Sequence, residues 1–428
     1  MRSTGSWLSN IRASSFLRSA ALLSGGSAAG HLFTLAVSPL LTRVYRPEDF
    51  ACLGLFTSYL SVATVGAAMQ YEASIISAAD SSEAAYLAMS AGCITIPASA
   101  LAGLALWLLI HYSLLGFGIL PGYVPIALSA VMCFVGYFSI LRYWNLRNQQ
   151  FRNVSRALVV QNAARAIFQT IAGILGVQDA GLIVGETLGR SVGMGHMFRS
   201  AWREIRAYTA EFRWSDCKRA LLKNWKFPLL SFPSSLIDAI CAGMALPLLV
   251  QEYGPQSGGE YALVWRVLAM PSVLIIQAVA DTFHSAIAKC ARETPAAVVA
   301  FFRRTCVGLL LAGFVPCAIL MLWARPLFTL VFGAQWALSG TMAAIIAPWY
   351  LGQFVVNPLS RVVLVLKGQA TKLIWDVLCL IAIPTVFYEA HLHRLNVLDA
   401  VRLLSIVSAA LYLVYFLVLL CLLFSHHR

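Results

Sequence analysis

Residues Pro39–Pro47 read PLLTRVYRP, and residues Pro247–Pro255 read PLLVQEYGP. The two stretches share the pattern P-L-L-x-x-x-Y-x-P and lie 247 − 39 = 208 residues apart, close to half of the 428-residue chain. Each stretch ends a hydrophobic segment that glycine or proline interrupts. The spacing predicts an internally duplicated protein, and paired interruptions in the two halves of a membrane transporter tend to mark its substrate path.

The composition predicts a membrane protein. Sixty percent of the residues are hydrophobic, 11% are charged and the mean hydropathy is +0.76, which is more apolar surface than a soluble domain of this length can bury. Closely spaced small residues in the apolar segments favour packed helices over the alternating strands of a β-barrel. Windows of about 20 apolar residues predict about twelve spans. They are Phe16–Leu41, Phe50–Ala73, Ala84–His111, Ile119–Leu141, Ala157–Val177, Ala180–Phe198, Phe227–Val250, Tyr261–Ala280, Ala297–Ala324, Leu338–Leu359, Leu373–Phe387 and Val397–Phe424.

The formal net charge of +13 is concentrated in a few loops. Residues 142–156, 199–226 and 289–304 hold most of the lysine and arginine, and an even number of spans puts these loops on the same side as both termini. By the positive-inside rule that side is cytoplasmic. The distribution of positive charge is therefore explained by the orientation of the protein in the membrane, and we expect no nucleic-acid partner. The first apolar run is too long for the signal-peptide core of roughly 7–15 residues, so we expect an uncleaved first span.

The longest polar stretch divides the predicted spans six and six. Residues 1–200 are the predicted N-lobe with spans 1–6, residues 201–226 a basic cytoplasmic linker, and residues 227–428 the C-lobe with spans 7–12. Six spans per half make the lobes parallel repeats, which leaves a central cleft. No outer loop is long enough for catalytic machinery, so we expect no enzyme activity. Ten cysteines without a C-x-x-C pair read as packing residues, and we expect no metal site and no cofactor.

Helix breakers occupy matching depths in the first and seventh spans. They are Gly25, Gly26, Gly30 and Pro39 in the first copy and Pro233 and Pro247 in the second. Breakers of this kind bend a helix and release backbone hydrogen bonds, which favours a gating role in both lobes. The alternative is that small residues serve tight helix packing.

A resemblance to a known family is visible near the N-terminus. Residues Ser38–Phe50 (SPLLTRVYRPEDF), followed by Gln70–Ile75 (QYEASI), resemble the N-terminal region of bacterial polysaccharide (O-antigen type) flippases of the multidrug/oligosaccharidyl-lipid/polysaccharide exporter superfamily. Ala51 stands where that family usually has glycine, and the close match covers about the first 80 residues. The resemblance implies a multi-pass protein of the bacterial inner membrane. It also implies a lipid-linked oligosaccharide substrate, and other polysaccharide-assembly proteins as potential partners.

The substrate so implied carries a pyrophosphate, which arginine binds better than lysine does. The intramembrane arginines Arg165, Arg190 and Arg266 are therefore candidate pyrophosphate ligands. Arg165 shares a predicted helix face with Gln161, Asn162 and Gln169, although it could instead snorkel to the cytoplasmic surface. Arg190 could instead pair with Glu186 four residues earlier, whereas Arg266 has no partner of opposite charge three or four residues away.

Three acids lie in or near the predicted spans: Glu72, Asp238 and Asp281. Glu72 plus the repeat offset of 208 gives position 280, one residue short of Asp281. These acids could bind a coupling cation, balance the arginines, or cap helix ends.

Together the residues and the resemblance predict a flippase that moves undecaprenyl-pyrophosphate-linked oligosaccharide from the cytoplasmic to the periplasmic leaflet by alternating access. The alternatives are a cation-coupled exporter of small amphipathic molecules from the same superfamily and a membrane-embedded glycan polymerase or ligase.

Overall fold

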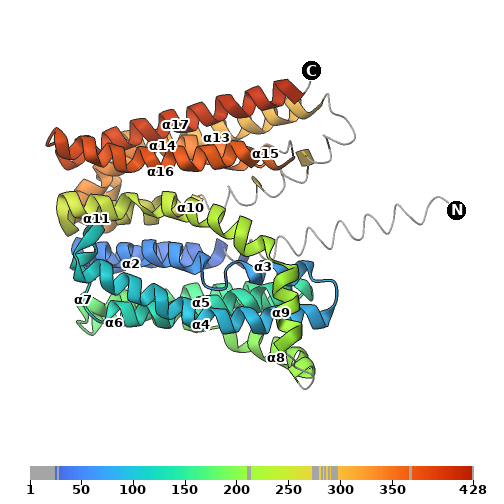
Figure 1. The fold of residues 1–428 in the computed structure, drawn as a ribbon. Coiled ribbons are helices and arrows are strands. Elements are labelled where there is room, and N and C mark those ends of the chain that lie inside the picture. The colour runs from blue at the N-terminus through green and yellow to red at the C-terminus, as the bar shows by residue number, and fades with distance from the viewer. Residues whose placement is uncertain are drawn as a thin grey trace. The chain divides into compact units, whose positions relative to one another are not determined.

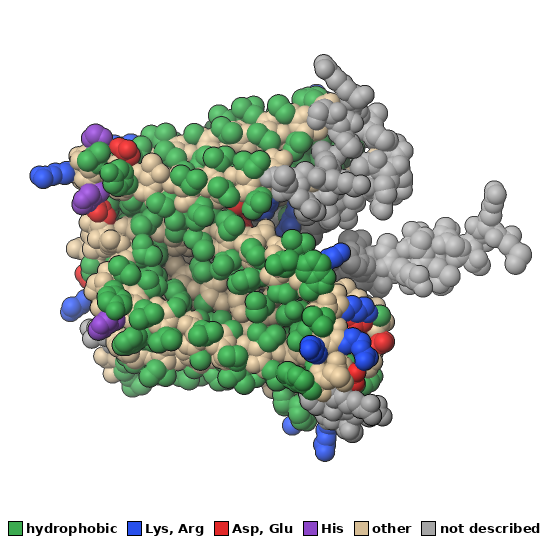
Figure 2. Space-filling model, viewed as in Figure 1, with side chains coloured by type: hydrophobic (Ala, Val, Ile, Leu, Met, Phe, Trp, Pro, Cys, Tyr) green, Lys and Arg blue, Asp and Glu red, His purple; other side chains and the backbone are tan. Residues whose placement is uncertain are grey.

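The computed structural model describes residues 25–26, 28–209, 214–271, 279–280, 283, 286–287, 290, 297–365 and 369–426. Within these residues every regular element is a helix (Figure 1). Large hydrophobic side chains cover the flanks of the long helices (Figure 2), and Leu330 and Ile126 are 78% and 76% exposed. Such a surface suits lipid rather than water.

The helices group into two compact units. Unit 1 comprises Met1–Val37, Leu60–Leu108 and Pro121–Leu236. After the helix over residues 28–44, its elements are the end of α2 (Pro47–Val65), α3 (Tyr71–Ser77), α4 (Ser81–His111), α5 (Val124–Arg147), α6 (Phe151–Ile174), α7 (Gln178–Ser191), α8 (Met194–Thr209), α9 (Trp214–Lys223), η2 (Phe227–Ser231) and the start of α10 (Phe232–Gly243). Within unit 1, α4, α5 and α6 run alongside one another, and α9 crosses their ends (Figure 1).

Unit 2 comprises Ser38–Tyr59, Leu109–Leu120 and Ile237–Arg428. It therefore combines two segments from the first half of the chain with nearly all of the second half. Its elements are the start of α2, η1 (Leu114–Ile119), most of α10, α11 (Ala245–Pro271), α13 (Ala297–Phe332), η4 (Ala334–Trp336), α14 (Ala337–Leu359), α15 (Val362–Val365), α16 (Gln369–Leu392) and α17 (Val397–His426).

The repeated Y-x-P pattern forms a helix junction in both copies. In the first copy the helix ends just before Tyr45, and Pro47 opens α2 with the Asp49 carboxylate accepting a hydrogen bond from the Arg46 backbone N–H at 2.9 Å. Proline suits this position because its missing N–H would be unpaired there anyway. In the second copy the chain bends at Gly254, whose φ of 80° favours glycine, and Pro255 begins the next helical stretch. The local structure thus repeats with the sequence.

The two turns pack against each other inside unit 2. A Cβ atom on Gly259 would lie 1.7 Å from the backbone oxygen of Pro47, so only glycine fits there. The fully buried Trp336 donates its indole N–H to the Thr42 carbonyl at 3.0 Å, and its ring meets that of Phe50 edge to face at 5.0 Å. We call this cluster of Thr42, Pro47, Phe50, Gly259 and Trp336 the turn junction.

The predicted all-α polytopic class is confirmed. By length and apolar character, seven helices among the described residues can cross a membrane. They are Ser81–His111, Val124–Arg147, Phe227–Ala269, Val298–Phe332, Ala334–Leu359, Thr371–Leu392 and Val397–Phe424. The division into lobes at residues 201–226 stays a prediction.

Two predicted span ends are wrong. The second span was expected to continue to Ala73, but α2 ends at Val65, because Met69 and Gln70 adopt left-handed φ angles of 51° and 64°. The sixth span was expected to reach Phe198, but α7 ends at Ser191 before Gly193, whose φ is 86°. Neither break contains a proline, and a hydropathy window does not detect a residue with a left-handed backbone conformation.

Substituting Gly259→Ala tests the turn junction. The added methyl group would collide with the Pro47 carbonyl, and overpacking of this kind costs about 1–3 kcal/mol or more. We expect the purified variant to unfold several degrees lower than the wild type in a detergent melting experiment. The matched control is Gly308→Ala in α13, where a Cβ would meet nothing within 4 Å. Equal melting temperatures for the two variants would contradict the described junction.

Candidate functional site

Close contact between α6 and α7 builds the site. The two helices run antiparallel, connected through Leu175–Val177. A Cβ on Gly189 would lie 2.5 Å from the Arg165 Cα, and one on Gly185 would lie 2.6 Å from the Gln169 backbone nitrogen. Glycines four residues apart let the backbones of membrane helices approach this closely. The G-x-x-x-G spacing of Gly185 and Gly189 was visible in the sequence but was not used in predicting the site.

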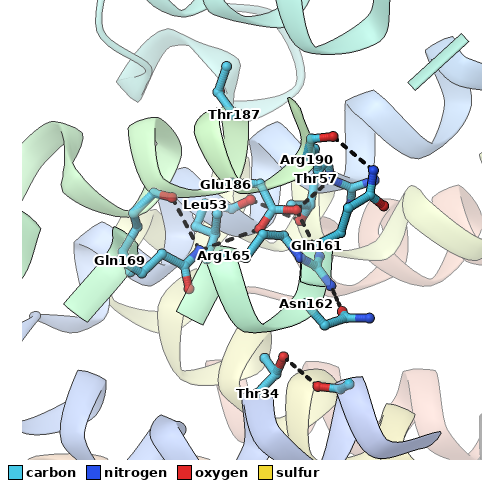
Figure 3. Close-up of polar contacts among 12 residues, drawn as sticks. Thr34, Leu53, Thr57, Gln161, Asn162, Arg165, Gln169, Glu186, Thr187 and Arg190 are labelled. Atoms are coloured by element: carbon cyan, nitrogen blue, oxygen red, sulfur yellow. Dashed lines mark hydrogen bonds and ion pairs between the residues drawn. The ribbon is translucent and has the colours of Figure 1, made fainter. Parts of the chain in front are cut away.

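Two arginines share one carboxylate at this contact. Glu186, with its side chain only 6% exposed, accepts on Oε1 from Arg165 Nη1 at 3.0 Å and from Arg190 Nε at 2.6 Å. Gln169 Nε2 donates to Oε2 of the same carboxylate at 3.4 Å. Figure 3 shows these side chains pointing toward Glu186. We call Arg165, Glu186 and Arg190 the arginine cluster.

The predicted polar stripe of α6 completes the site. Asn162 accepts a hydrogen bond on Oδ1 from the second terminal nitrogen of Arg165 and donates from Nδ2 to the Leu158 carbonyl at 2.9 Å. Gln161 Nε2 donates to the Arg190 backbone oxygen at 2.9 Å. From α6, Asn162 therefore binds the side chain of Arg165 and Gln161 binds the backbone of Arg190, while Glu186 on α7 pairs with both guanidinium groups.

The arginine cluster has an excess positive charge deep in α6. Two guanidinium groups face one carboxylate, which leaves a formal charge of +1. Arg165 lies 14 residues after Phe151, about 21 Å along the helix at 1.5 Å per residue, too far for its side chain to snorkel to that end. The side chains of Arg165 and Arg190 are 19% and 29% exposed, and the buried Arg165 Nε has no hydrogen-bond partner among the described residues.

The third candidate arginine lies elsewhere, in α11 of unit 2. Arg266 donates from Nε to the Ser38 hydroxyl at 3.1 Å, and its guanidinium carbon lies 5.8 Å from the centre of the Phe50 ring. These contacts put it next to the turn junction rather than with the arginine cluster. Its partners belong to other segments of the chain, as expected from the lack of an acid nearby in sequence.

A second charged cluster lies in unit 2 and contains the candidate Asp238 together with Lys372 and Asp376, which the sequence analysis did not single out. Lys372 Nζ on α16 lies 3.1 Å from an Asp238 oxygen on α10 and 2.9 Å from both oxygens of Asp376. Asp376 is nearly fully buried, whereas the Asp238 side chain is 66% exposed. One ammonium faces two carboxylates, so the cluster has a formal charge of −1. The four-residue spacing of Lys372 and Asp376 was the available sequence signal.

The other two acids do not join either cluster. Glu72 belongs to α3 instead of the second span, is 6% exposed, and its Oε2 has no hydrogen-bond partner among the described residues. Asp281 lies outside the described residues.

The predicted helix breakers differ in their surroundings. A Cβ on Gly26 would lie 2.0 Å from Ser155 Oγ, and one on Gly30 would lie 2.5 Å from Asn162 Nδ2, so both glycines meet α6 closely, whereas Gly25 meets nothing within 4 Å. The helix over residues 28–44 continues through Pro39 without a break. In the second copy Pro233 is the second residue of α10, two positions after the π-helical turn η2 ends, and Pro247 is the third residue of α11, which begins just after the break at Met244.

Comparison with known proteins identifies the family. The family profile described as polysaccharide biosynthesis protein matches residues 40–340, well over half of the chain. The chain belongs to this family. No curated protein sequence matches the chain significantly. The predicted relation to polysaccharide proteins is therefore confirmed at the level of the family.

Solved structures confirm the fold of this polysaccharide biosynthesis protein. The lipid II flippase MurJ in an inward closed conformation matches with a TM-score of 0.68 and 16% identity over 95% of this chain and 87% of that chain. A multidrug resistance MATE family transporter of the MOP superfamily in an inward-facing conformation matches with a TM-score of 0.67 and 15% identity over 94% of both chains. The Vibrio cholerae MATE transporter VcmN in the bent form matches with a TM-score of 0.53 and 17% identity over 96% of this chain and 98% of that chain.

Glu186→Gln should destabilise the protein more than Arg190→Gln does. The first change leaves two arginines without a carboxylate, and breaking a buried pair in this way costs about 3–5 kcal/mol. The second leaves the pair of Arg165 and Glu186 intact. We expect the melting temperature of the purified protein to follow this order. The opposite order would mean that Glu186 is not the centre of the cluster.

Proposed function

We propose that this protein flips undecaprenyl-pyrophosphate-linked oligosaccharide, an O-antigen or other polysaccharide repeat unit, from the cytoplasmic to the periplasmic leaflet of the bacterial inner membrane. The observation that carries the proposal is the excess positive charge of the arginine cluster on α6 and α7, whose residues belong to the predicted fifth and sixth spans. Membership of a polysaccharide biosynthesis family and a fold shared with a lipid II flippase support it.

The chemistry of the substrate matches the arginine cluster. A pyrophosphate cannot cross hydrocarbon bare, and the planar donors of arginine bind phosphate oxygens in pairs. Arg165 and Arg190 are held by Glu186, which limits the side-chain entropy that binding would cost. Arg266, on α11, is the corresponding candidate in the second half of the chain. In the proposed alternating-access cycle the lobes 1–200 and 227–428 move about the linker 201–226, and the helix breakers of the first and seventh spans form the gates.

The two alternatives are less well supported. A small amphipathic cation would be repelled by the net positive arginine cluster. A glycan polymerase or ligase would need a nucleophile and base at its reacting bond, and we assign no such role to any residue.

Substituting the arginines tests the function directly. In vesicles that contain the purified protein and a lipid-linked oligosaccharide, we expect Arg165→Ala and Arg266→Ala each to slow flipping about tenfold or more, since charge-assisted hydrogen bonds contribute about 1.5–3 kcal/mol. Lysine at either position should restore part of the rate. The control is Arg325→Ala, an exposed arginine of α13 that we place outside the transport path.

Three equal rates at equal reconstitution would disprove the arginine-based mechanism. A wild-type protein that exports an amphipathic cation but moves no lipid-linked oligosaccharide would favour the exporter alternative.

The membrane potential can drive this reaction. About two negative charges leave a negative interior, and each is worth roughly 2.3 kcal/mol per 100 mV, so the gain approaches about 4–5 kcal/mol per 100 mV. Asp238 and Asp376 already hold a tethered cation, the Lys372 ammonium, which balances one of their two negative charges. We propose that Asp238, together with Glu72 and Asp281, tunes the return of the empty carrier.

Asp238→Asn should therefore slow flipping without abolishing it. Lys372 keeps Asp376 as its partner in this variant, so the buried carboxylate stays neutralised. The measurement uses vesicles with a membrane potential but neither a proton nor a sodium gradient, where the wild type should still flip. Loss of wild-type flipping under these conditions would demonstrate obligatory ion coupling instead.

The proposed orientation is testable with reporter fusions. The basic loops should face the cytoplasm. A reporter active only in the cytoplasm should therefore be active when fused at Lys218 or after Arg428, and inactive at Glu48 or His391. Reversed activities would rule out cytoplasmic termini.

A further inference from the structure

Helices α8 and α9 are held at one end of the membrane helices of unit 1. Two residues, Val192 and Gly193, separate α8 from α7. The Glu204 carboxylate on α8 accepts from the Trp144 indole N–H of α5 at 3.0 Å. Lys223 at the end of α9 pairs with Glu83 in the first turn of α4 at 2.7 Å. Both helices are therefore fixed at the level where the spans end.

The exposed surface of α8 has two kinds of side chain. Met197 and Ala201 are fully buried in the core of unit 1. Beside them, Phe198 and Trp202 are 50% and 47% exposed and stack on each other at 5.5 Å with an interplanar angle of 16°. The next residues along the chain, Arg199 and Arg203, are also exposed. An aromatic pair therefore lies directly next to two arginines.

A pocket of about 230 Å³ adjoins this surface. Its α6 side consists of Asn153, Arg156, Ala157 and Val160, and its α8 side of Gly193, Gly195 and His196. The wall of the pocket is almost wholly apolar, which suits glycerol and acyl carbons, and the exposed Arg156 and His196 border it, where they can meet a headgroup phosphate. Lysine and arginine side chains gather over the end of unit 1 where α8 and α9 lie (Figure 2).

We propose that this surface is a binding site for anionic phospholipid of the leaflet on which α8 and α9 lie. Phe198 and Trp202 enter the headgroup region, where aromatic side chains are favoured. Arg199 and Arg203 bind lipid phosphates, and Arg156 binds the headgroup phosphate in the pocket. The three exposed cations Arg156, Arg199 and Arg203 match a negatively charged surface. The site serves the orientation of unit 1 in the membrane and does not depend on which substrate is moved.

Quenching of tryptophan fluorescence by brominated lipid tests the proposal. The full-length protein is placed in nanodiscs with brominated phosphatidylglycerol or brominated phosphatidylcholine, and the signal of Trp202 among the eleven tryptophans is taken as the difference between wild type and Trp202→Phe. We expect phosphatidylglycerol to quench this component about twofold more than phosphatidylcholine does.

The substitution set Arg156→Gln, Arg199→Gln and Arg203→Gln should abolish the preference and lower the affinity for phosphatidylglycerol about tenfold. The matched control removes the same charge from unit 2 with Arg303→Gln, Arg304→Gln and Arg325→Gln, and should keep the preference.

Three results would overturn the proposal. The first is equal quenching by the two lipids, and the second is quenching by neither, which would mean that another protein surface covers Trp202. The third is a preference that small amounts of undecaprenyl pyrophosphate abolish, because the site would then belong to the transported lipid. Two separate measurements distinguish this site from the proposed function. Flipping by the wild type in vesicles of zwitterionic lipid alone would support the proposed function, and the quenching preference in nanodiscs would support this site.

Discussion

An arginine in the middle of a membrane-spanning helix costs several kcal/mol unless an opposite charge or water meets it. In this protein Arg165 lies on α6, in the predicted fifth span, and meets that cost through Glu186 on α7, whose single carboxylate is shared by Arg165 and Arg190. The close approach of the two helices follows from the same need, since Gly185 and Gly189 have no side chains to hold the backbones apart. The polar stripe of α6 then satisfies donors that the carboxylate does not reach.

The two charged clusters have opposite excess charge. The arginine cluster on α6 and α7 has a formal charge of +1, and the cluster of Asp238, Lys372 and Asp376 has a formal charge of −1. A pyrophosphate is attracted to the first and repelled by the second.

The turn junction links the duplication to the packing of unit 2. Both Y-x-P sequences make the same local structure, a helix end followed by a proline-opened helix, and the two turns then meet where Gly259 faces Pro47. Trp336 closes the cluster from the second half by bonding the Thr42 carbonyl. The repeated motifs thus lie at a packing contact between segments more than 200 residues apart in the sequence.

The sequence by itself predicted the membrane class, the internal repeat, most of the spans and, as an alternative to a substrate contact, the pairing of Glu186 with Arg190. These depend on hydropathy over about 20 residues, on repeated motifs and on neighbours four positions apart, all of which are local. It did not predict the left-handed breaks at Gln70 and Gly193, because neither has the proline that would have signalled a helix end. Only the tertiary structure decided that Arg165 shares its carboxylate with Arg190, that Lys372 neutralises Asp238, and that Arg266 lies by the turn junction instead. Those partners come from different helices, and which helices approach closely depends on small residues and packing that no local pattern encodes.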